Sequence, residues 1–153
     1  MILSTICYIE KDNKYLMLHR TKKEKDINKN KWIGVGGKFE EGESPEDCIK
    51  REVKEETGLT LKEYQLKGIV TYISTTCETE YMHIFTANDF EGELIECNEG
   101  DLQWIDKDEV MKLNTWEGDR IFLEKLLKEE SSFFSIKFEY DGEKLIRYSI
   151  KEY

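Results

Sequence analysis

Apolar and polar positions along the chain follow two patterns, one typical of β-strands and one typical of helices. In several stretches, β-branched, aliphatic and aromatic residues alternate with polar ones or stand together, and this pattern predicts β-strands. The predicted strands cover residues 2–9, 14–19, 64–75, 80–87 and 101–105, together with a hairpin between residues 133 and 153. The hairpin turn is expected at Tyr140-Asp141-Gly142-Glu143, because Asp-Gly is a strong turn signal.

A helix is predicted between residues 44 and 58. Ser44 suits the N-cap, Pro45 suits the first helical position, and Asp47 completes a weaker form of the capping box. Gly58 fits the position just past the helix, which often needs a left-handed backbone. The expected buried face holds Cys48, Ile49 and Val53.

A second helix is predicted from about Trp116 to Lys128. Its apolar side is expected to contain Ile121, Leu123, Leu126 and Leu127.

Between the second strand and the first helix, the chain is polar and then rich in glycine. Residues 21–31 predict a solvated surface loop, with a mobile rim around a site as the alternative. In the following segment, residues 32–37, glycines allow close backbone approach, so a main-chain carbonyl could join a metal shell.

The composition fits one compact domain spanning residues 1–153. Hydrophobic residues make up 39% and charged residues 37% of the chain. No apolar run reaches the length of a membrane span, and the first residues read as a strand, not as a signal peptide. The scattered cysteines form no C-x-x-C pair, which argues against a zinc site and for reduced core or near-core residues in a cytoplasmic protein: Cys7, Cys48, Cys77 and Cys97.

The formal net charge of −10 restricts the class of partner. A protein this acidic is not expected to bind nucleic acid stably. It also repels a free polyphosphate, so a phosphorylated substrate is expected to arrive as its metal complex.

Glu52, Glu55 and Glu56 stand at i, i+3 and i+4 in the first predicted helix. This spacing places their carboxylates on one side of the helix. Like charges at this separation repel each other, and a divalent cation would relieve the repulsion. An all-oxygen ligand set favours Mg²⁺ or Mn²⁺. A solvated, glutamate-rich helix face is the alternative interpretation.

These glutamates lie within a longer motif, G-x5-E-x7-R-E-U-x-E-E-x-G-U, in which U is a bulky aliphatic residue. Its specified positions are filled by Gly37, Glu43, Arg51, Glu52, Val53, Glu55, Glu56, Gly58 and Leu59. In this motif the chain resembles the Nudix hydrolases. The resemblance implies an α/β fold, a single-domain α/β/α sandwich with a mixed β-sheet. It also implies metal-assisted hydrolysis of a nucleoside diphosphate linked to another moiety.

Outside the motif, nearly the whole chain is similar to the MutT-type branch of that family, which hydrolyses oxidised purine nucleoside triphosphates. The stretches that carry this similarity are Trp32 to Lys38, Asn98-Glu99-Gly100 with Trp104, Trp116 with Asp119, and Phe138 to Gly142.

The resemblance assigns a metal-binding and catalytic set. Its expected metal ligands are the carboxylates of Glu52, Glu55, Glu56 and Glu99 and the main-chain carbonyl of Gly36. Glu52 and Glu99 are alternative candidates for the base that acts on the attacking water. Glu43 and Arg51 are expected to pair behind the ligands, next to Gly37. Arg20 and Lys38 are expected to contact phosphate, with plain surface charges as the alternative.

The expected base-binding residues are Ile33, Trp116 and Asp119. Trp116 offers an aromatic face to a purine, or else packs the last helix as a core residue. Asp119 could be kept neutral by desolvation and read the purine edge, or else cap the helix. Ile33 stands where relatives carry an asparagine that touches the base, and Gly118 interrupts a pair of acids found in those relatives. Base discrimination is therefore expected to differ here.

The resulting hypothesis is a magnesium-dependent pyrophosphohydrolase. Its expected substrate is 8-oxo-dGTP, cleaved to 8-oxo-dGMP and pyrophosphate, which sanitises the nucleotide pool and prevents mutation. The alternative is a Nudix hydrolase with another small-molecule or RNA-end substrate: an unmodified NTP or dNTP, a dinucleoside polyphosphate, a nucleotide sugar or an RNA 5′ triphosphate.

Overall fold

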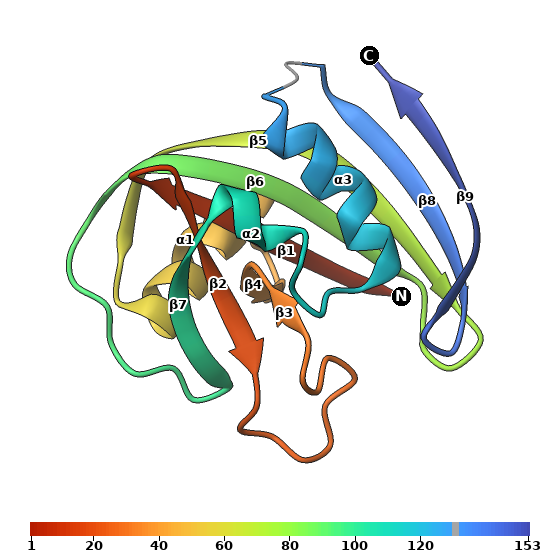
Figure 1. The fold of residues 1–153 in the computed structure, drawn as a ribbon, viewed down its shortest axis with the longest axis horizontal. Helices are drawn as coiled ribbons and strands as arrows, with labels where there is room; N and C mark the ends of the chain where they lie inside the picture. The colour runs from red at the N-terminus through yellow and green to blue at the C-terminus, as the bar shows by residue number, and fades with distance from the viewer. Residues whose placement is uncertain (130–131) are drawn as a thin grey trace.

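A mixed β-sheet forms the centre of the molecule (Figure 1). The computed structural model describes residues 1–129 and 132–153. The strand order is β3-β2-β1-β6-β5-β8-β9, with β4 paired to β1 and β7 paired to β2. The strands are β1 (Ile2–Lys11), β2 (Lys14–Arg20), β3 (Trp32–Ile33), β4 (Val35–Lys38), β5 (Thr60–Ser74), β6 (Glu80–Glu91), β7 (Gly100–Asp106), β8 (Phe134–Asp141) and β9 (Lys144–Glu152). The helices are α1 (Pro45–Thr57), α2 (Lys107–Val110) and α3 (Glu117–Leu127).

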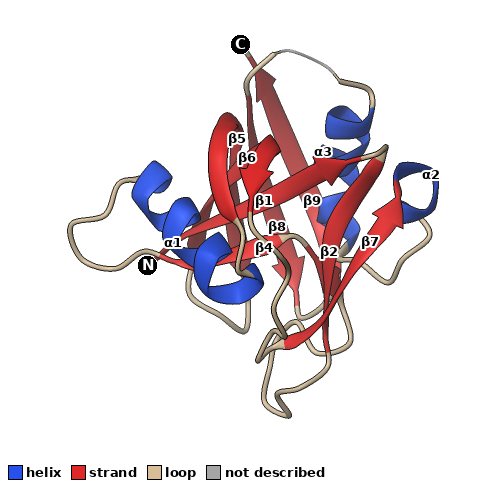
Figure 2. Cartoon of the chain, turned by 90° about the vertical axis from the view of Figure 1, so that its left-hand side faces the viewer, coloured by secondary structure: helices blue, strands red, loops and turns tan. Residues whose placement is uncertain are grey.

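Helices cover both faces of the sheet, as predicted. Figure 2 shows α1 on one side and α2 and α3 on the other. The core under α1 contains Ile49 and Val53 together with Leu16 from β2. The core under α3 contains Phe122 together with Tyr8 from β1. Burial of apolar area on both faces is the main force that holds the layers together.

The predicted signals at the ends of α1 are confirmed. Ser44 Oγ accepts a hydrogen bond from the Asp47 amide at 3.0 Å, and the Asp47 carboxylate accepts one from the Ser44 amide at 3.1 Å. Gly58 ends the helix with a left-handed φ of 81°. Cys48, Ile49 and Val53 are completely buried. The helix that carries the glutamates therefore starts, ends and faces the core as its sequence predicts.

The sheet is mixed because β1 pairs in parallel with β6, and β5 pairs in parallel with β8. The other pairings are antiparallel, including the β8–β9 hairpin. The strands β5 and β6 are longer than predicted and reach back to Thr60 and forward to Glu91. Register shifts between Leu61 and Tyr64 accommodate this extension, and such bulges leave no clear two-residue pattern in the sequence.

Several sequence predictions need correction. Cys77 is exposed, whereas a core position was expected. Trp116, not Asp119, occupies the N-cap position of α3, because Asp119 already lies in the first helical turn. The buried face of α3 is centred on Phe122, which is fully buried and was not predicted, and Ile121 is only partly buried. The short helix α2 was not predicted either.

None of the helices formed by the described residues has the length and apolar character needed to cross a bilayer.

Phe122 is expected to contribute strongly to stability. Its ring is fully buried, with its centroid 5.9 Å from that of Tyr8. We expect Phe122→Ala to lower the free energy of unfolding by about 3–5 kcal/mol, because it removes a large side chain and leaves a cavity. The matched change Ile121→Ala, at the partly buried neighbour, should cost about 1 kcal/mol. Urea unfolding of both variants measures the difference, and equal losses would contradict the assignment of the core face.

Candidate active site

A cavity of about 650 Å³ opens where several elements meet. Its floor comes from β1 and from the adjoining ends of β5 and β6. Its walls come from β4, α1 and the start of α3, and the loop of residues 21–31 forms part of its rim. One end carries the predicted metal-binding residues Gly36, Glu52 and Glu99, and the other carries Trp116 and Asp119. The structure therefore brings members of both groups of predicted site residues to the same cavity, whereas Glu55 and Glu56 are not among its lining residues.

At the acidic end, Arg51 contacts the glutamates that crowd one side of α1. Its guanidinium donates to Glu52 at 2.7 Å and to Glu55 at 3.2 Å. It also makes paired hydrogen bonds to Glu43, at 2.7 and 2.8 Å. These bonds from Arg51 lower the pKa of Glu43 to about 2, so Glu43 stays ionised. The expected pairing of Glu43 and Arg51 is present, and it ties the loop before α1 to the helix.

Glu56 is the most unusual carboxyl of the site. Its side chain is buried, and both of its oxygens lack a hydrogen-bond partner within the described part of the chain. Burial, and then the neighbouring carboxylates of Glu99 and Glu52, raise its pKa to about 9. A buried carboxyl without a partner costs free energy, so this arrangement does not serve the stability of the metal-free chain.

Glu99 comes from the loop before β7 and is held by cations. Arg20 lies 3.2 Å from one of its oxygens, and Lys23 lies 3.2 Å from the other. Arg20 also pairs with Asp26 at 2.9 Å. Arg20 therefore lies beside a predicted ligand and lines the cavity, while Lys38 lies at the edge of the same cavity.

The donor set fits a divalent metal ion. The unpartnered oxygens of Glu56 lie among the negative charges of Glu52 and Glu99, and a cation would relieve both the desolvation and the repulsion. No group of three or more such side chains is already gathered at ligating distance among the described residues. Instead, Glu52 and Glu55 bind Arg51, and Glu99 binds Arg20 and Lys23.

Glycine is required where β4 passes α1. A Cβ atom on Gly37 would lie 2.5 Å from the carboxyl carbon of Glu52, and one on Gly36 would lie 2.0 Å from the carbonyl oxygen of Thr5. Both approaches are far closer than real contacts. The two glycines therefore allow the strand to run between β1 and the acidic side of α1, with the Gly36 backbone lining the cavity.

The other end of the cavity is aromatic. Trp116 is 6% exposed, and its ring meets those of Tyr72 and Tyr140 edge-on at 6.1 and 5.6 Å. Its indole N–H donates to the Asn28 side chain at 2.8 Å. Trp116 is thus a member of the core that also lines the cavity, so it combines features of both alternative interpretations. Ile33 lies in the lining too and adds only apolar surface.

Asp119 is a buried carboxyl in the aromatic end. It is 9% exposed, and burial, and then the charge of Glu80, raise its pKa to about 7, while Lys31 opposes the shift. A carboxyl in this state can be neutral near pH 7 and donate a hydrogen bond. Its position and its protonation thus fit the predicted contact with a base.

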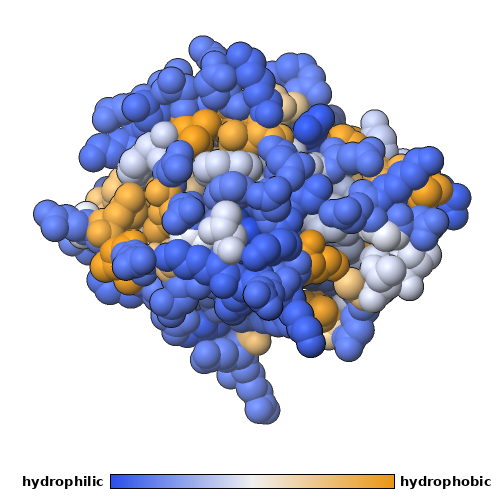
Figure 3. Space-filling model, turned by 60° about the horizontal axis from the view of Figure 1, so that its bottom comes forward, coloured by the Kyte–Doolittle hydropathy of each residue, from blue (hydrophilic) through white to orange (hydrophobic). Residues whose placement is uncertain are grey.

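The loop of residues 21–31 lies on the rim of the cavity and is largely exposed. It reaches both ends, because Lys23 pairs with Glu99 and Asn28 accepts the hydrogen bond from Trp116. Figure 3 brings this side of the molecule forward and shows a mostly hydrophilic surface broken by separate hydrophobic areas. The loop is therefore a polar surface loop, as predicted, and it also lies at the rim of the cavity.

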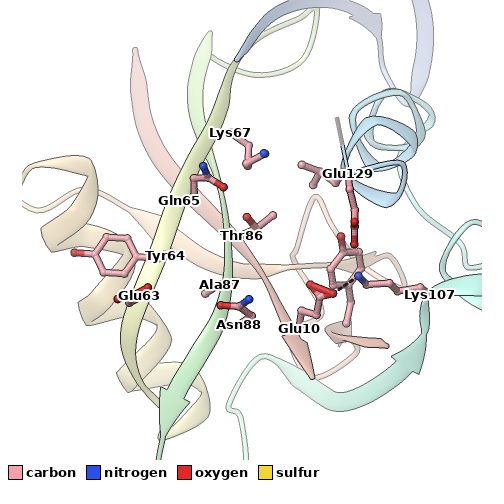
Figure 4. Close-up of a pocket in the computed structure, with 12 residues that line it drawn as sticks. Glu10, Glu63, Tyr64, Gln65, Lys67, Thr86, Ala87, Asn88, Lys107 and Glu129 are labelled. Carbon is pink, nitrogen blue, oxygen red and sulfur yellow. Dashed lines mark hydrogen bonds and ion pairs between the residues drawn. The ribbon is translucent and has the colours of Figure 1, made fainter. Parts of the chain in front are cut away.

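A second cavity, of about 600 Å³, lies between the β5–β6 pair and the ends of α2 and α3 (Figure 4). It contains none of the predicted site residues. Lys107 in its wall is paired with Glu10 and lies over the ring of Tyr15, with its nitrogen 5.1 Å from the ring centre. This cation is already partnered, so the chemistry of the chain is assigned to the first cavity.

Several residues that line the first cavity were not predicted from the sequence: Lys23, Asn28, Tyr72, Glu80 and Met82. Tyr72, Glu80 and Met82 lie on predicted strands, Tyr72 on β5 and the other two on β6. Which face looks into the cavity depends on the pairing of β5 with β6 and on the position of α3, and neither is a local property of the sequence.

Comparisons with known proteins point to one family. The model of the NUDIX domain matches residues 2–126. An uncharacterized Nudix hydrolase of Bacillus subtilis, YvcI, is 34% identical over 129 residues, which cover 81% of this chain and 78% of the relative. An oxidized purine nucleoside triphosphate hydrolase of Danio rerio is 34% identical over 119 residues, covering 76% of each chain. The crystal structure of a MutT protein from Bacillus halodurans superposes with a TM-score of 0.88 at 30% identity, covering 99% of this chain and 98% of that one.

Asp119 predicts how stability depends on pH. Its pKa rises from an ordinary 3.8 to about 7 on folding. Between these values the unfolded chain releases the proton and the folded chain keeps it, so the contribution of Asp119 to the stability of the wild type falls as pH rises from about 4 to 7. Asp119→Asn removes this titration. We therefore expect the variant to gain on the order of 2–4 kcal/mol relative to the wild type across this window, and no more above it.

Urea unfolding of the metal-free proteins at a series of pH values measures this gain. Asp89→Asn, at an exposed position on β6, serves as the control and should parallel the wild type. A constant difference between wild type and Asp119→Asn from pH 4 to pH 8 would contradict the assignment.

Proposed function

We propose that this chain, which belongs to the Nudix family of hydrolases, hydrolyses 8-oxo-dGTP to 8-oxo-dGMP and pyrophosphate with Mg²⁺. The observation that carries the proposal is the single cavity with two unlike ends. One end carries Glu52 and Glu99, whose charges act on the buried, unpartnered carboxyl of Glu56, and the other holds Trp116 and the buried carboxyl of Asp119. Relatives named as oxidized purine nucleoside triphosphate hydrolases support this choice of substrate.

The acidic end would hold the metal through Glu52, Glu56 and Glu99, with Glu55 and the Gly36 carbonyl as further ligands. Mg²⁺, when bound there, supplies Lewis-acid chemistry that neutralises charge on the phosphates. All of these donors are oxygen atoms, which is the ligand type that Mg²⁺ prefers.

The chain's own cations would bind the triphosphate. Arg20 and Lys23 now pair with Glu99, and Lys38 lies at the edge of the same cavity. If Glu99 binds the metal ion, Arg20 and Lys23 would become available to the phosphate oxygens. The chain has a net charge of −10, so such local cations are needed for a polyphosphate to bind.

Hydrolysis requires a group that accepts a proton from water. Glu52 and Glu99 both line the cavity, so each of their carboxylates is a candidate for this role. The water oxygen forms a bond to the α- or the β-phosphorus, and the phosphoanhydride bond between them breaks. The phosphate group on the other side of that bond leaves with the electron pair, which gives nucleoside monophosphate and pyrophosphate in either case. The loop of residues 21–31 would limit the access of further water from its side of the cavity.

The aromatic end would hold the base. Trp116 and Tyr72 provide flat apolar surface, and Asp119 provides a carboxyl whose pKa is raised to about 7, so that a large fraction of it is protonated near neutral pH. Such a group complements a purine edge that presents a carbonyl oxygen beside an N–H group. The side chain of Ile33 cannot form a hydrogen bond with the base. Asp119 would therefore contribute more to base recognition here than it would in a site with asparagine at the position of Ile33.

The substrate proposal is tested by steady-state hydrolysis of 8-oxo-dGTP and dGTP, each with Mg²⁺ and with chelator. We expect kcat/KM to favour the oxidised nucleotide by about tenfold or more, because one well-placed hydrogen bond contributes this much. Chelator should abolish both activities. Equal rates on the two nucleotides would leave a Nudix hydrolase with a different nucleotide substrate.

A charge-removing change at Glu56 separates catalysis from folding. Glu56→Gln keeps the shape of the side chain and removes a metal-binding oxygen, so we expect kcat/KM to fall at least about 100-fold. The metal-free variant should unfold at a urea concentration no lower than the wild type, because the buried carboxyl contributes no partnered contact there. Glu46→Gln, in the first turn of the same helix, is the matched control and should retain activity. A stable Glu56→Gln variant with wild-type activity would contradict the role of Glu56.

A further inference from the structure

The floor of the aromatic end is made of side chains that alternate along β6. On the face turned toward α3, Ile84 is fully buried, Met82 is partly buried and lines the cavity, and Glu80 follows at the start of the strand. Tyr72 stands directly opposite Glu80 on β5. The apolar row formed by Ile84 and Met82 therefore ends at Glu80, an acidic residue inside the cavity. An apolar residue at this position would have continued the packing.

Glu80 is held in place by Ser4 of β1. The Ser4 hydroxyl donates to Glu80 Oε2 at 2.6 Å, and Ser4 is only 4% exposed. No cation pairs with Glu80 among the residues that the structure describes, so its other oxygen, Oε1, keeps its capacity to accept a hydrogen bond. Because Glu80 lines the cavity, this oxygen is available to a ligand that donates a hydrogen bond.

Two further polar groups belong to this end of the cavity. The Tyr72 hydroxyl is buried without a hydrogen bond in the described residues, and the Asp119 carboxyl is 9% exposed and lines the same cavity. Glu80 is close enough to Asp119 to be the main charge that raises its pKa. The polar groups of Glu80, Tyr72 and Asp119 thus line one space, beside the ring of Trp116.

We propose that Glu80, positioned by Ser4, is a specificity-determining residue of this cavity and accepts a hydrogen bond from an N–H group on the edge of a purine base. This rests on the proposed function, which places the base at the aromatic end. A fixed acceptor favours bases whose edge presents N–H donors, as guanine does with N1–H and its exocyclic amine. It disfavours bases that present lone pairs there, because two acceptors would then face each other. Glu80 thereby supplies recognition that Ile33 does not provide.

The test uses binding of the reaction's product class, so it does not depend on turnover. Isothermal titration calorimetry in Mg²⁺ measures the Kd of 8-oxo-dGMP, dGMP, dAMP and deoxyribose 5-phosphate, the last as a ligand without a base. Glu80→Met removes the acceptor and keeps the length of the side chain. Glu80→Gln keeps an acceptor oxygen. Ser4→Ala removes the positioning hydroxyl, and Glu91→Gln, at the exposed far end of β6, is the matched control.

We expect Glu80→Met to weaken binding of the guanine-type monophosphates about tenfold and to leave deoxyribose 5-phosphate unchanged. Glu80→Gln and Ser4→Ala should show smaller losses in the same direction, and Glu91→Gln none. Thermal unfolding of each variant confirms that it is folded at the temperature of the titration.

The outcomes separate this proposal from the proposed substrate. If Glu80→Met retains wild-type affinity for every base, the role of Glu80 is overturned and the substrate proposal is unaffected. If the wild type prefers an unoxidised purine and Glu80→Met loses that preference, the role of Glu80 is supported and the preference for the oxidised base fails. If the wild type binds no purine more tightly than deoxyribose 5-phosphate, both proposals are overturned.

Discussion

The contact between Arg51 and the crowded carboxylates of α1 is the interaction on which the rest of the site depends. One guanidinium binds Glu43 twice, reaches Glu52 and Glu55, and donates to the Lys38 carbonyl at 3.0 Å. A planar fork of donors can serve so many acceptors at once, whereas a lysine ammonium would have too few. The pairing fixes the loop before α1 to the end of β4. Because one guanidinium serves three carboxylates, several acids can also stand on one side of α1 without a separate cation for each of them.

The two ends of the cavity are built by different means. Most of the acidic end is local, because β4, the following loop and α1 are consecutive in the chain and are tied together by Arg51 and by the close approach of Gly37 to Glu52. Glu99 is the distant contribution to this end, and it is held there by Arg20 and Lys23. The aromatic end is assembled from distant segments, since β1, β5, β6 and the start of α3 each contribute side chains. The acidic end and the aromatic end are therefore separate parts of one cavity, built from different segments of the chain.

This difference explains what the sequence could and could not predict. The limits of α1, its cap at Ser44, its buried Val53 and the whole acidic motif follow from local spacing, and the structure confirms these features. The roles given to the motif glutamates stay predictions. The aromatic end could be predicted only in part. Trp116 was identified by resemblance, but Glu80 and Tyr72 were missed, because their common face gains meaning only when β5 and β6 pair. Phe122 was missed for a similar reason, since the buried side of α3 is decided by the sheet beneath it.

The pairing of β5 with β8 has a consequence for the order in which the chain can fold. Ile69 and Val70 on β5 pair with Ser135 and Ile136, which lie much later in the sequence. During synthesis, β5 leaves the ribosome well before β8 does, so one edge of the growing sheet and the apolar surface below α3 stay uncovered until residues 134–141 emerge. The chain is most exposed to misassociation in that interval. The NUDIX domain match ends at residue 126, and β8 begins beyond it. The segment outside the family match is thus the one that ends this vulnerable stage.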